Sequence, residues 1–325
     1  MKLDRKTSLI VVLLICATYT IITIAEIKPH SDYKYPDYRI NVWPYLYTCS
    51  LDQNPFTDRA PLKWYSICAS YKIFGNENII PFLFSLVILP LTYRLGWLLT
   101  NKHLVGLVAL VIVVTSISFT RWDTSATYDQ SWAFFLILAL NMTHTKYAPL
   151  SYIASIASKT LAFAYLPMYL YQISRQKEQL TLYNLTAILV PLFIVFLLFY
   201  NVEKTLGTDI SFDINRLYEG SWKWLFYFAD DLHIMIGTPV MLAMLYIMKS
   251  KIRGADVVFW WCTGIILTVP LIMGFTTQLV HPYRFVPFTI FFGIGVGMVV
   301  NHFAQKLSSK LLVSRHGLRT SQNNP

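Results

Sequence analysis

Charged residues are scarce in this chain. Asp, Glu, Lys and Arg make up 14% of its 325 residues, whereas 55% are hydrophobic. An average soluble domain contains about 25% charged residues, so this composition excludes an ordinary soluble protein. Several windows contain the roughly 20 apolar residues that are needed to cross a bilayer. We therefore expect an all-α polytopic protein that is integral to the cell (inner) membrane.

Acidic residues are scarcer than basic ones. The chain contains 17 Asp and Glu residues against 27 Lys and Arg residues, which gives a formal net charge of +10. Most of the basic residues fall in short connections and near the C-terminus, where the positive-inside rule of membrane proteins explains them. The charge therefore predicts membrane lipids as partners and no nucleic acid.

Cysteine is also rare, with four in the chain. Cys16 and Cys262 lie in apolar segments and are expected to be inert. Cys49 and Cys68 both lie in a polar segment, where they could form a disulfide if that segment faces an oxidising compartment. Two free thiols are the alternative.

Apolar segments alternate with the short basic connections. They cover residues 8–26, 79–98, 103–119, 130–142, 148–173, 183–202, 232–248, 256–278 and 284–303. If each segment crossed the membrane once, basic connections would fall on both sides, against the positive-inside rule. The conflict disappears if 148–173 enters and returns as two short helices. This gives about ten transmembrane or re-entrant helices, with both termini cytoplasmic.

The segment 148–173 is too short for two full crossings. Pro149 and Pro167 suit a broken geometry, and the turn would lie close to Lys159. A lysine within the membrane is costly unless it is paired, which makes Lys159 a functional candidate. Alternatively, its amine could reach the interface while its stem stays in apolar surroundings.

One long polar segment, residues 27–78, separates the first two apolar segments and is rich in Asp, Tyr and Trp. It would be a large first extracytoplasmic loop. An ordinary connector would contain fewer aromatic residues, so we expect binding or chemistry there. The expected organisation is one transmembrane domain over 1–303 and a basic cytoplasmic tail over 304–325.

Several short motifs occur in an order that is typical of one enzyme family. The loop contains Pro36-Asp37-Tyr38-Arg39, Asp58-Arg59-Ala60-Pro61-Leu62 and Tyr71-Lys72-Ile73-Phe74-Gly75. Later segments contain Tyr128-Asp129-Gln130-Ser131-Trp132-Ala133-Phe134-Phe135, Ser158-Lys159-Thr160-Leu161 and His281-Pro282-Tyr283-Arg284-Phe285-Val286-Pro287. Together these motifs resemble the GT-C membrane glycosyltransferases, which include the protein O-mannosyltransferases and the aminoarabinose transferases.

The resemblance implies a GT-C-like bundle that moves a sugar, with inversion, from a polyprenyl-phosphate donor to a hydroxyl of a glycan, lipid or protein acceptor. Such a transfer needs a base for the acceptor proton and cations for the leaving phosphate. Asp37 is the expected base and Asp32 its rival, although either could be a helix N-cap. Asp129 could be a second active-site carboxylate that orients the acceptor or a metal, or it could cap the fourth helix.

Basic residues at the outer ends of helices are the candidates for binding the carrier phosphate: Lys159, Arg284, His281 and Arg59. An arginine fork can bind two phosphate oxygens at once. Aromatic residues of the loop could stack on sugar faces or form an interfacial belt: Trp43, Tyr45, Trp64 and Tyr65. A divalent cation, Mg or Mn, could assist through carboxylate ligands. The sequence Asp230-Asp231-Leu232-His233 could hold such a metal or simply begin a helix.

Two other classes of function fit the composition. A lipid or sugar transporter, or a flippase, would be expected to show paired half-structures with matching interrupted helices. Only one broken pair is evident in this sequence. A non-catalytic subunit of a membrane complex is the third class, because many GT-C enzymes are longer and carry an added soluble domain.

Overall fold

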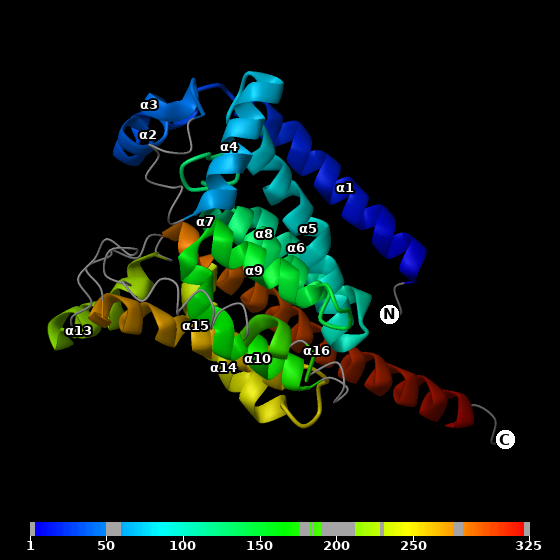
Figure 1. Cartoon of the computed structure of the whole chain (residues 1–325). Helices are drawn as coiled ribbons and strands as arrows, with labels where there is room; N and C mark the ends of the chain where they lie inside the picture. The colour runs from blue at the N-terminus through cyan, green and yellow to red at the C-terminus, as the bar shows by residue number, and fades with distance from the viewer. Residues whose placement is uncertain are drawn as a thin grey trace.

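The computed structural model describes residues 4–49, 60–175, 182–183, 185–189, 212–227, 231–275 and 282–321. Within these ranges the chain is helical and contains no strand, which confirms the all-α prediction (Figure 1). Four of the described helices are long and apolar enough to cross a membrane. They are α1 (Arg5–Ile24), α5 (Ile79–Thr100), α15 (Ala255–Phe275) and α16 (Val286–Ser321).

Shorter elements connect and cover these four helices. They are η1 (Ser31–Lys34), α2 (Pro36–Asn41), α3 (Trp43–Leu46), α4 (Pro61–Phe74), α6 (His103–Thr115), α7 (Ile117–Thr120), α8 (Ser131–Asn141), α9 (Ala148–Ser158), η2 (Thr160–Tyr165), α10 (Leu166–Ser174), α13 (Ile214–Tyr227), α14 (Leu232–Met248) and η3 (Pro282–Phe285).

Local sequence explains where many of these helices begin. α2, α3, α4, α9 and α10 each have a proline in the first turn, where its missing N–H costs no hydrogen bond. α1 begins after Asp4, whose carboxylate accepts a hydrogen bond from the N–H of Thr7 at 3.1 Å.

Glycines allow α16 to lie inside the bundle. A Cβ atom at Gly293 would be 3.0 Å from the Cα of Ala109, and one at Gly297 would be 2.7 Å from the carbonyl oxygen of Val105. Such small residues let two membrane helices approach closely. The apolar window of α16 is therefore 67% buried, whereas that of α1, at the outside of the bundle, is 22% buried.

The expected break near Lys159 is present. α9 ends at Ser158, and Lys159 has the extended conformation φ −162°, ψ 120°. The 3-10 helix η2 and then α10 follow it, with Pro167 in the first turn of α10. Two short helices thus replace one long one.

The expected boundary between the transmembrane domain and the basic tail falls within a helix and stays a prediction. α16 runs from Val286 to Ser321, so residue 303 lies within a helix. The prediction placed the boundary where hydropathy falls. A fall in hydropathy does not end a helix, because Lys, Gln, Leu and Ala all have high helix propensity.

Polar connections gather at two ends of the bundle. One shared pocket is lined by Lys102 after α5, by Lys251 and Arg253 after α14, and by His302 of α16. Two basic connections and a histidine of α16, which the positive-inside rule assigns to one side, therefore lie together.

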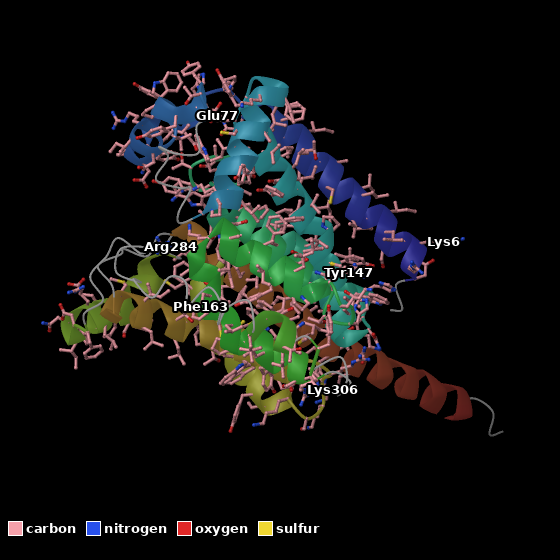
Figure 2. All side chains as sticks on the ribbon, viewed as in Figure 1. Lys6, Glu77, Tyr147, Phe163, Arg284 and Lys306 are labelled. Carbon is pink, nitrogen blue, oxygen red and sulfur yellow. The ribbon has the colours of Figure 1, made fainter. Side chains whose placement is uncertain are left out.

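The labelled side chains show the same separation. Figure 2 places Lys6, Tyr147 and Lys306 away from Glu77 and Arg284. The second end of the bundle carries the first loop and the loop between α7 and α8, and it contains the candidate site.

Candidate functional site

The first loop folds into a small lobe with its own apolar core. Short helices α2 and α3 pack on α4, and the α7–α8 loop (121–130) adds one residue. The buried core of this first-loop lobe consists of Tyr38, Val42, Leu46, Trp64, Ile67, Cys68 and Ala126. The lobe lies at the top of the view in Figure 1. The described parts of the first loop, which was predicted to be catalytic, are thus packed together around a common apolar core.

The aromatic residues of the lobe differ in their exposure. Trp64 is fully buried, so it packs the lobe and cannot stack on a sugar in this conformation, which corrects the prediction for that residue. Tyr65 is 49% exposed, and Trp43 and Tyr45 are half-buried. The ring of Trp43 meets the His30 imidazole edge-on at 4.5 Å. These three residues remain candidates for stacking.

Asp32 joins the first-loop lobe to the α7–α8 loop. Its carboxylate accepts hydrogen bonds from the Ser125 hydroxyl at 2.7 Å and from the Thr127 N–H at 2.8 Å. The side-chain oxygen of Asn78 accepts a further bond from the N–H of Ala126 at 3.0 Å. The α7–α8 loop is therefore held by polar groups that lie far away in the sequence.

The carboxyl group of Asp32 is an interior group. Its residue is 3% exposed. Burial raises the pKa of Asp32 above its usual range, and the negative charge of Glu77 acts in the same direction, although the hydrogen bonds from Thr127 and Ser125 oppose them. Its position fits a structural role better than contact with an acceptor.

Asp37 is the accessible carboxylate of the pair. It lies in the first turn of α2 and is half-buried. The hydroxyl of Tyr128 donates a hydrogen bond to its Oδ2 atom at 3.0 Å. The Tyr128 ring is itself held by edge contacts with Trp122 at 4.8 Å and Tyr35 at 5.2 Å. The α7–α8 loop therefore fixes the direction of an Asp37 side chain that solvent can still reach.

Glu77 is a buried carboxylate that the sequence analysis missed. It accepts hydrogen bonds from the His30 N–H and the Tyr38 hydroxyl, each at 2.7 Å, and the His30 imidazole lies 3.3 Å away. It is completely buried. A usable signal was the polar run 76–78 directly before the apolar helix α5, where an acidic residue needs partners.

Asp129 forms a buried ion pair with Lys63. The Lys63 Nζ atom lies 3.6 Å from Asp129, and it also donates a hydrogen bond to the carbonyl of Thr127. The other carboxylate oxygen accepts from the N–H of Ser131, the first residue of α8, at 3.2 Å. Asp129 thus contacts the start of α8 and a cation together. Lys63 was not among the residues predicted from the sequence.

The expected phosphate-binding cations come from other elements. Lys159 is the C-cap of α9, and Arg284 lies in η3 just before α16. The hydroxyl of Tyr165, at the end of η2, donates to the Arg284 carbonyl at 3.3 Å. The segments that carry the two cations are therefore joined.

The short helix α7 lies between the two groups of residues. It contacts η3, the element that carries Arg284. The α7–α8 loop, which carries Tyr128 and Asp129, follows it directly. Figure 2 shows Arg284 near the start of α16, below the part of the molecule that contains Glu77. The segments that carry Asp129 and Arg284 are thus linked through α7, and a joint role of the expected carboxylates and cations stays a prediction.

Some of the expected residues lie outside the described ranges, namely Arg59, His281 and Asp230. Asp231 is described, and it accepts hydrogen bonds from the Ser116 hydroxyl and from the N–H groups of Ile117 and Ser118 at 2.7 to 2.9 Å. Burial alone would raise the pKa of Asp231. The hydrogen bonds outweigh the effect of burial, so the pKa of Asp231 lies below its usual range. Asp231 therefore caps α7 from a distance.

A multidentate metal site is not formed by the described residues. Among them, no three His, Cys, Asp or Glu side chains gather closely enough to hold a metal ion.

The thiols of Cys49 and Cys68 lie in the same apolar cluster. Both are reduced in the structure, and the Sγ atom of Cys49 lies 3.2 Å from the carbonyl oxygen of Leu46. Burial, together with a hydrogen bond to Cys49, raises the pKa of Cys68. The two side chains are neighbours, as their pairing would require, and the disulfide stays a prediction.

Comparison with protein-family models, with curated proteins and with solved structures finds no match for this chain. A proposal of function therefore depends on the residues and their geometry alone.

Proposed function

We propose that this protein is an inverting membrane glycosyltransferase. It transfers a sugar from a polyprenyl-phosphate carrier to the hydroxyl of a glycan, lipid or protein acceptor. The observation that carries the proposal is the accessibility and orientation of Asp37. Its carboxylate is half-buried, and the Tyr128 hydroxyl donates a hydrogen bond to its Oδ2 atom at 3.0 Å. The neighbouring Asp32 and Asp129 are each buried and engaged with other groups.

The chemistry requires one proton transfer and one displacement. Asp37 takes the proton from the acceptor hydroxyl, and the acceptor oxygen then bonds to the anomeric carbon of the sugar. The bond from that carbon to the phosphate oxygen breaks, and the carrier phosphate leaves with the bonding electrons. Attack from the face opposite the leaving group inverts the anomeric centre.

Lys159 and Arg284 are the proposed partners of the leaving phosphate. Cations placed where negative charge develops lower the barrier of such a step. The extended backbone at Lys159 separates α9 from η2. Such a break within a membrane is tolerated where the backbone is buried in protein or lines a polar cavity. Trp43, Tyr45 and Tyr65 are the proposed contacts of the sugar ring.

The proposed topology follows from the distribution of charge. The shared basic pocket of Lys102, Lys251, Arg253 and His302 faces the cytoplasm together with both termini. The first-loop lobe then faces outward, where polyprenyl-linked sugars and oxidising conditions for Cys49 and Cys68 would be found.

The test is Asp37→Asn, which keeps the shape of the side chain and removes the base. Purified wild-type and variant protein in detergent would be given farnesyl-phosphate mannose, glucose and aminoarabinose with mixed membrane acceptors. Loss of a general base should reduce the transfer rate by at least about a hundredfold. Asp4→Asn, at an exposed aspartate that caps α1, is the matched control and should keep full activity.

The outcomes distinguish the three classes of function. Equal transfer by Asp37→Asn and wild type would remove Asp37 from the mechanism. If farnesyl phosphate binds but no sugar is transferred, and the lipid moves between leaflets in vesicles, the protein is a flippase. If neither binding nor transfer occurs, a non-catalytic subunit is the better description.

A further inference from the structure

A lateral groove runs along the outside of the bundle between α1 and the α6–α7 segment. It has a volume of about 810 Å³, which is in the range of ligand-binding sites. One wall consists of residues of α1 and the segment that follows it: Leu14, Ile15, Thr18, Tyr19, Ile22, Thr23 and Glu26. The other consists of Val114, Thr115, Ile117, Thr120, Arg121 and Asp123.

The groove is apolar along most of its length and polar at one end. From Leu14 to Thr23 the α1 wall extends about 14 Å, at 1.5 Å per residue. One leaflet of a bilayer has a hydrocarbon thickness of about 15 Å, half of the 30 Å core. The apolar part therefore matches the depth of one leaflet, on the side of the first-loop lobe. A lipid chain fits this shape.

The polar end carries two carboxylates and a guanidinium group. Glu26 and Arg121 are exposed, whereas Asp123 is 2% exposed. The Oδ2 atom of Asp123 accepts a hydrogen bond from the Tyr19 hydroxyl at 2.5 Å. Its Oδ1 atom is buried and has no hydrogen-bond partner among the described residues. A buried carboxylate oxygen without a partner is costly, so a donor from outside the chain would stabilise it.

These charges select one kind of headgroup. A primary ammonium provides N–H donors for Asp123 and Glu26, and a phosphate suits the guanidinium fork of Arg121. A headgroup with both features is zwitterionic. A quaternary ammonium carries no N–H group and cannot satisfy the Asp123 Oδ1 atom. A purely anionic headgroup would meet two carboxylates.

We propose that this groove binds one phosphatidylethanolamine molecule, with an acyl chain between α1 and α6, its ammonium group on Asp123 and its phosphate on Arg121. The site is separate from Asp37 and from the proposed transfer reaction. Asp123 and the partners of Asp32 share the α7–α8 loop, so the bound lipid would also support the loop that holds Asp37 through Tyr128.

The test measures which lipid stays with the protein. Delipidated protein would be placed in nanodiscs of equal parts phosphatidylethanolamine, phosphatidylcholine and phosphatidylglycerol, re-extracted in mild detergent and analysed by native mass spectrometry. We expect phosphatidylethanolamine to be retained about tenfold over phosphatidylcholine, which corresponds to about 1.4 kcal/mol. Equal retention of the two lipids would overturn the proposal.

Two variants locate the bound lipid. Ile22→Trp fills the groove from its α1 wall without changing any charge, whereas Ile21→Trp places the same ring on a neighbouring exposed position outside the groove. We expect Ile22→Trp to abolish the preference and Ile21→Trp to keep it. An unchanged preference in Ile22→Trp would show that the lipid binds elsewhere.

The headgroup is tested by Asp123→Asn. At pH 8, where the carboxyl group of Asp123 is ionised, removal of its charge should bring retention of phosphatidylethanolamine down to that of phosphatidylcholine, while total bound lipid stays constant. A preference that survives in a folded Asp123→Asn protein would contradict the role of this carboxylate. If that variant does not fold, the comparison of Ile22→Trp with Ile21→Trp still decides.

Discussion

Among single residues, the buried carboxylates differ mainly in the hydrogen bonds that they receive. The pKa of Asp231 is lowered because three hydrogen-bond donors at the start of α7 outweigh the effect of burial. Asp123 receives one strong bond from Tyr19. Burial, with the charge of Glu26 acting in the same direction, raises the pKa of Asp123 to about 7. Identical side chains thus titrate in different ranges because their partners differ.

The raised pKa of Asp123 predicts a pH dependence of stability. The folded protein holds this proton up to about pH 7, whereas an unfolded aspartate releases it near pH 3.9. Folded protein binds more protons between these values, so the contribution of Asp123 to the free energy of unfolding is largest below about pH 4. It decreases as pH rises toward 7 and is then constant.

The measurement compares wild type with Asp123→Asn, because other groups titrate equally in both. The difference in the free energy of unfolding should change by on the order of 1 kcal/mol per pH unit between pH 4 and 7. It would be followed by denaturant unfolding in delipidated detergent solution. A difference that stays constant over this range would contradict the raised pKa.

The sequence could not predict which single residues of the candidate site are exposed to solvent and which are buried. Asp32 and Asp37 have similar local contexts, and their order as candidates rested on resemblance. Asp32 is buried because Ser125 and Thr127 bond to it from more than ninety positions away. Trp64 was misjudged for the same reason, since the core of the first-loop lobe includes Ala126. Pairings over such distances leave no local pattern.

Whole elements were more predictable, because their causes are local. Prolines begin α9 and α10, and the break between these helices falls at Lys159 as expected. The apolar segments 79–98 and 232–248 coincide closely with α5 and α14. Packing between elements was harder to foresee. The glycines of α16 were not identified as contacts, although Gly293 and Gly297 have the spacing that lets membrane helices approach.

The contact between α6 and α16 predicts the effect of a single methyl group. In Gly297→Ala the new Cβ would lie 2.7 Å from the Val105 carbonyl oxygen, so a helix backbone must move. We expect a loss of about 1 to 3 kcal/mol, as for other overpacked cores. The matched control is Gly264→Ala, where the nearest atom is the Sδ of Met168, 2.6 Å away on a flexible side chain.

Both variants would be compared by thermal unfolding in the same detergent. The expected result is a clearly lower midpoint for Gly297→Ala than for Gly264→Ala. Equal midpoints would indicate that α16 can shift along α6 without cost, and the close contact of these helices would then not be a source of stability.

For the whole molecule, the distribution of charge and the fold both distinguish two ends of the bundle. Only the charge indicates which end faces the cytoplasm. Lys102 comes from the connection after α5, Lys251 and Arg253 come from the connection after α14, and all three share one pocket. Carboxylates and aromatic rings of the first-loop lobe gather at the other end (Figure 2). An isolated bundle has no direction in a membrane. Orientation comes from the way in which basic residues resist translocation, so it is inferred from the positive-inside rule.

The last prediction tests this orientation. Lys34 and Lys251 are both exposed lysines, one in the first-loop lobe and one in the basic connection after α14. Each would be changed to cysteine in a background in which the four native cysteines are replaced by alanine. Intact cells would be treated with a membrane-impermeant maleimide. Because the lobe is proposed to face outward, Lys34→Cys should be labelled at once and Lys251→Cys only after the membrane is permeabilised. Labelling of Lys251→Cys alone in intact cells would reverse the topology, and with it the side on which Asp37 could meet an acceptor.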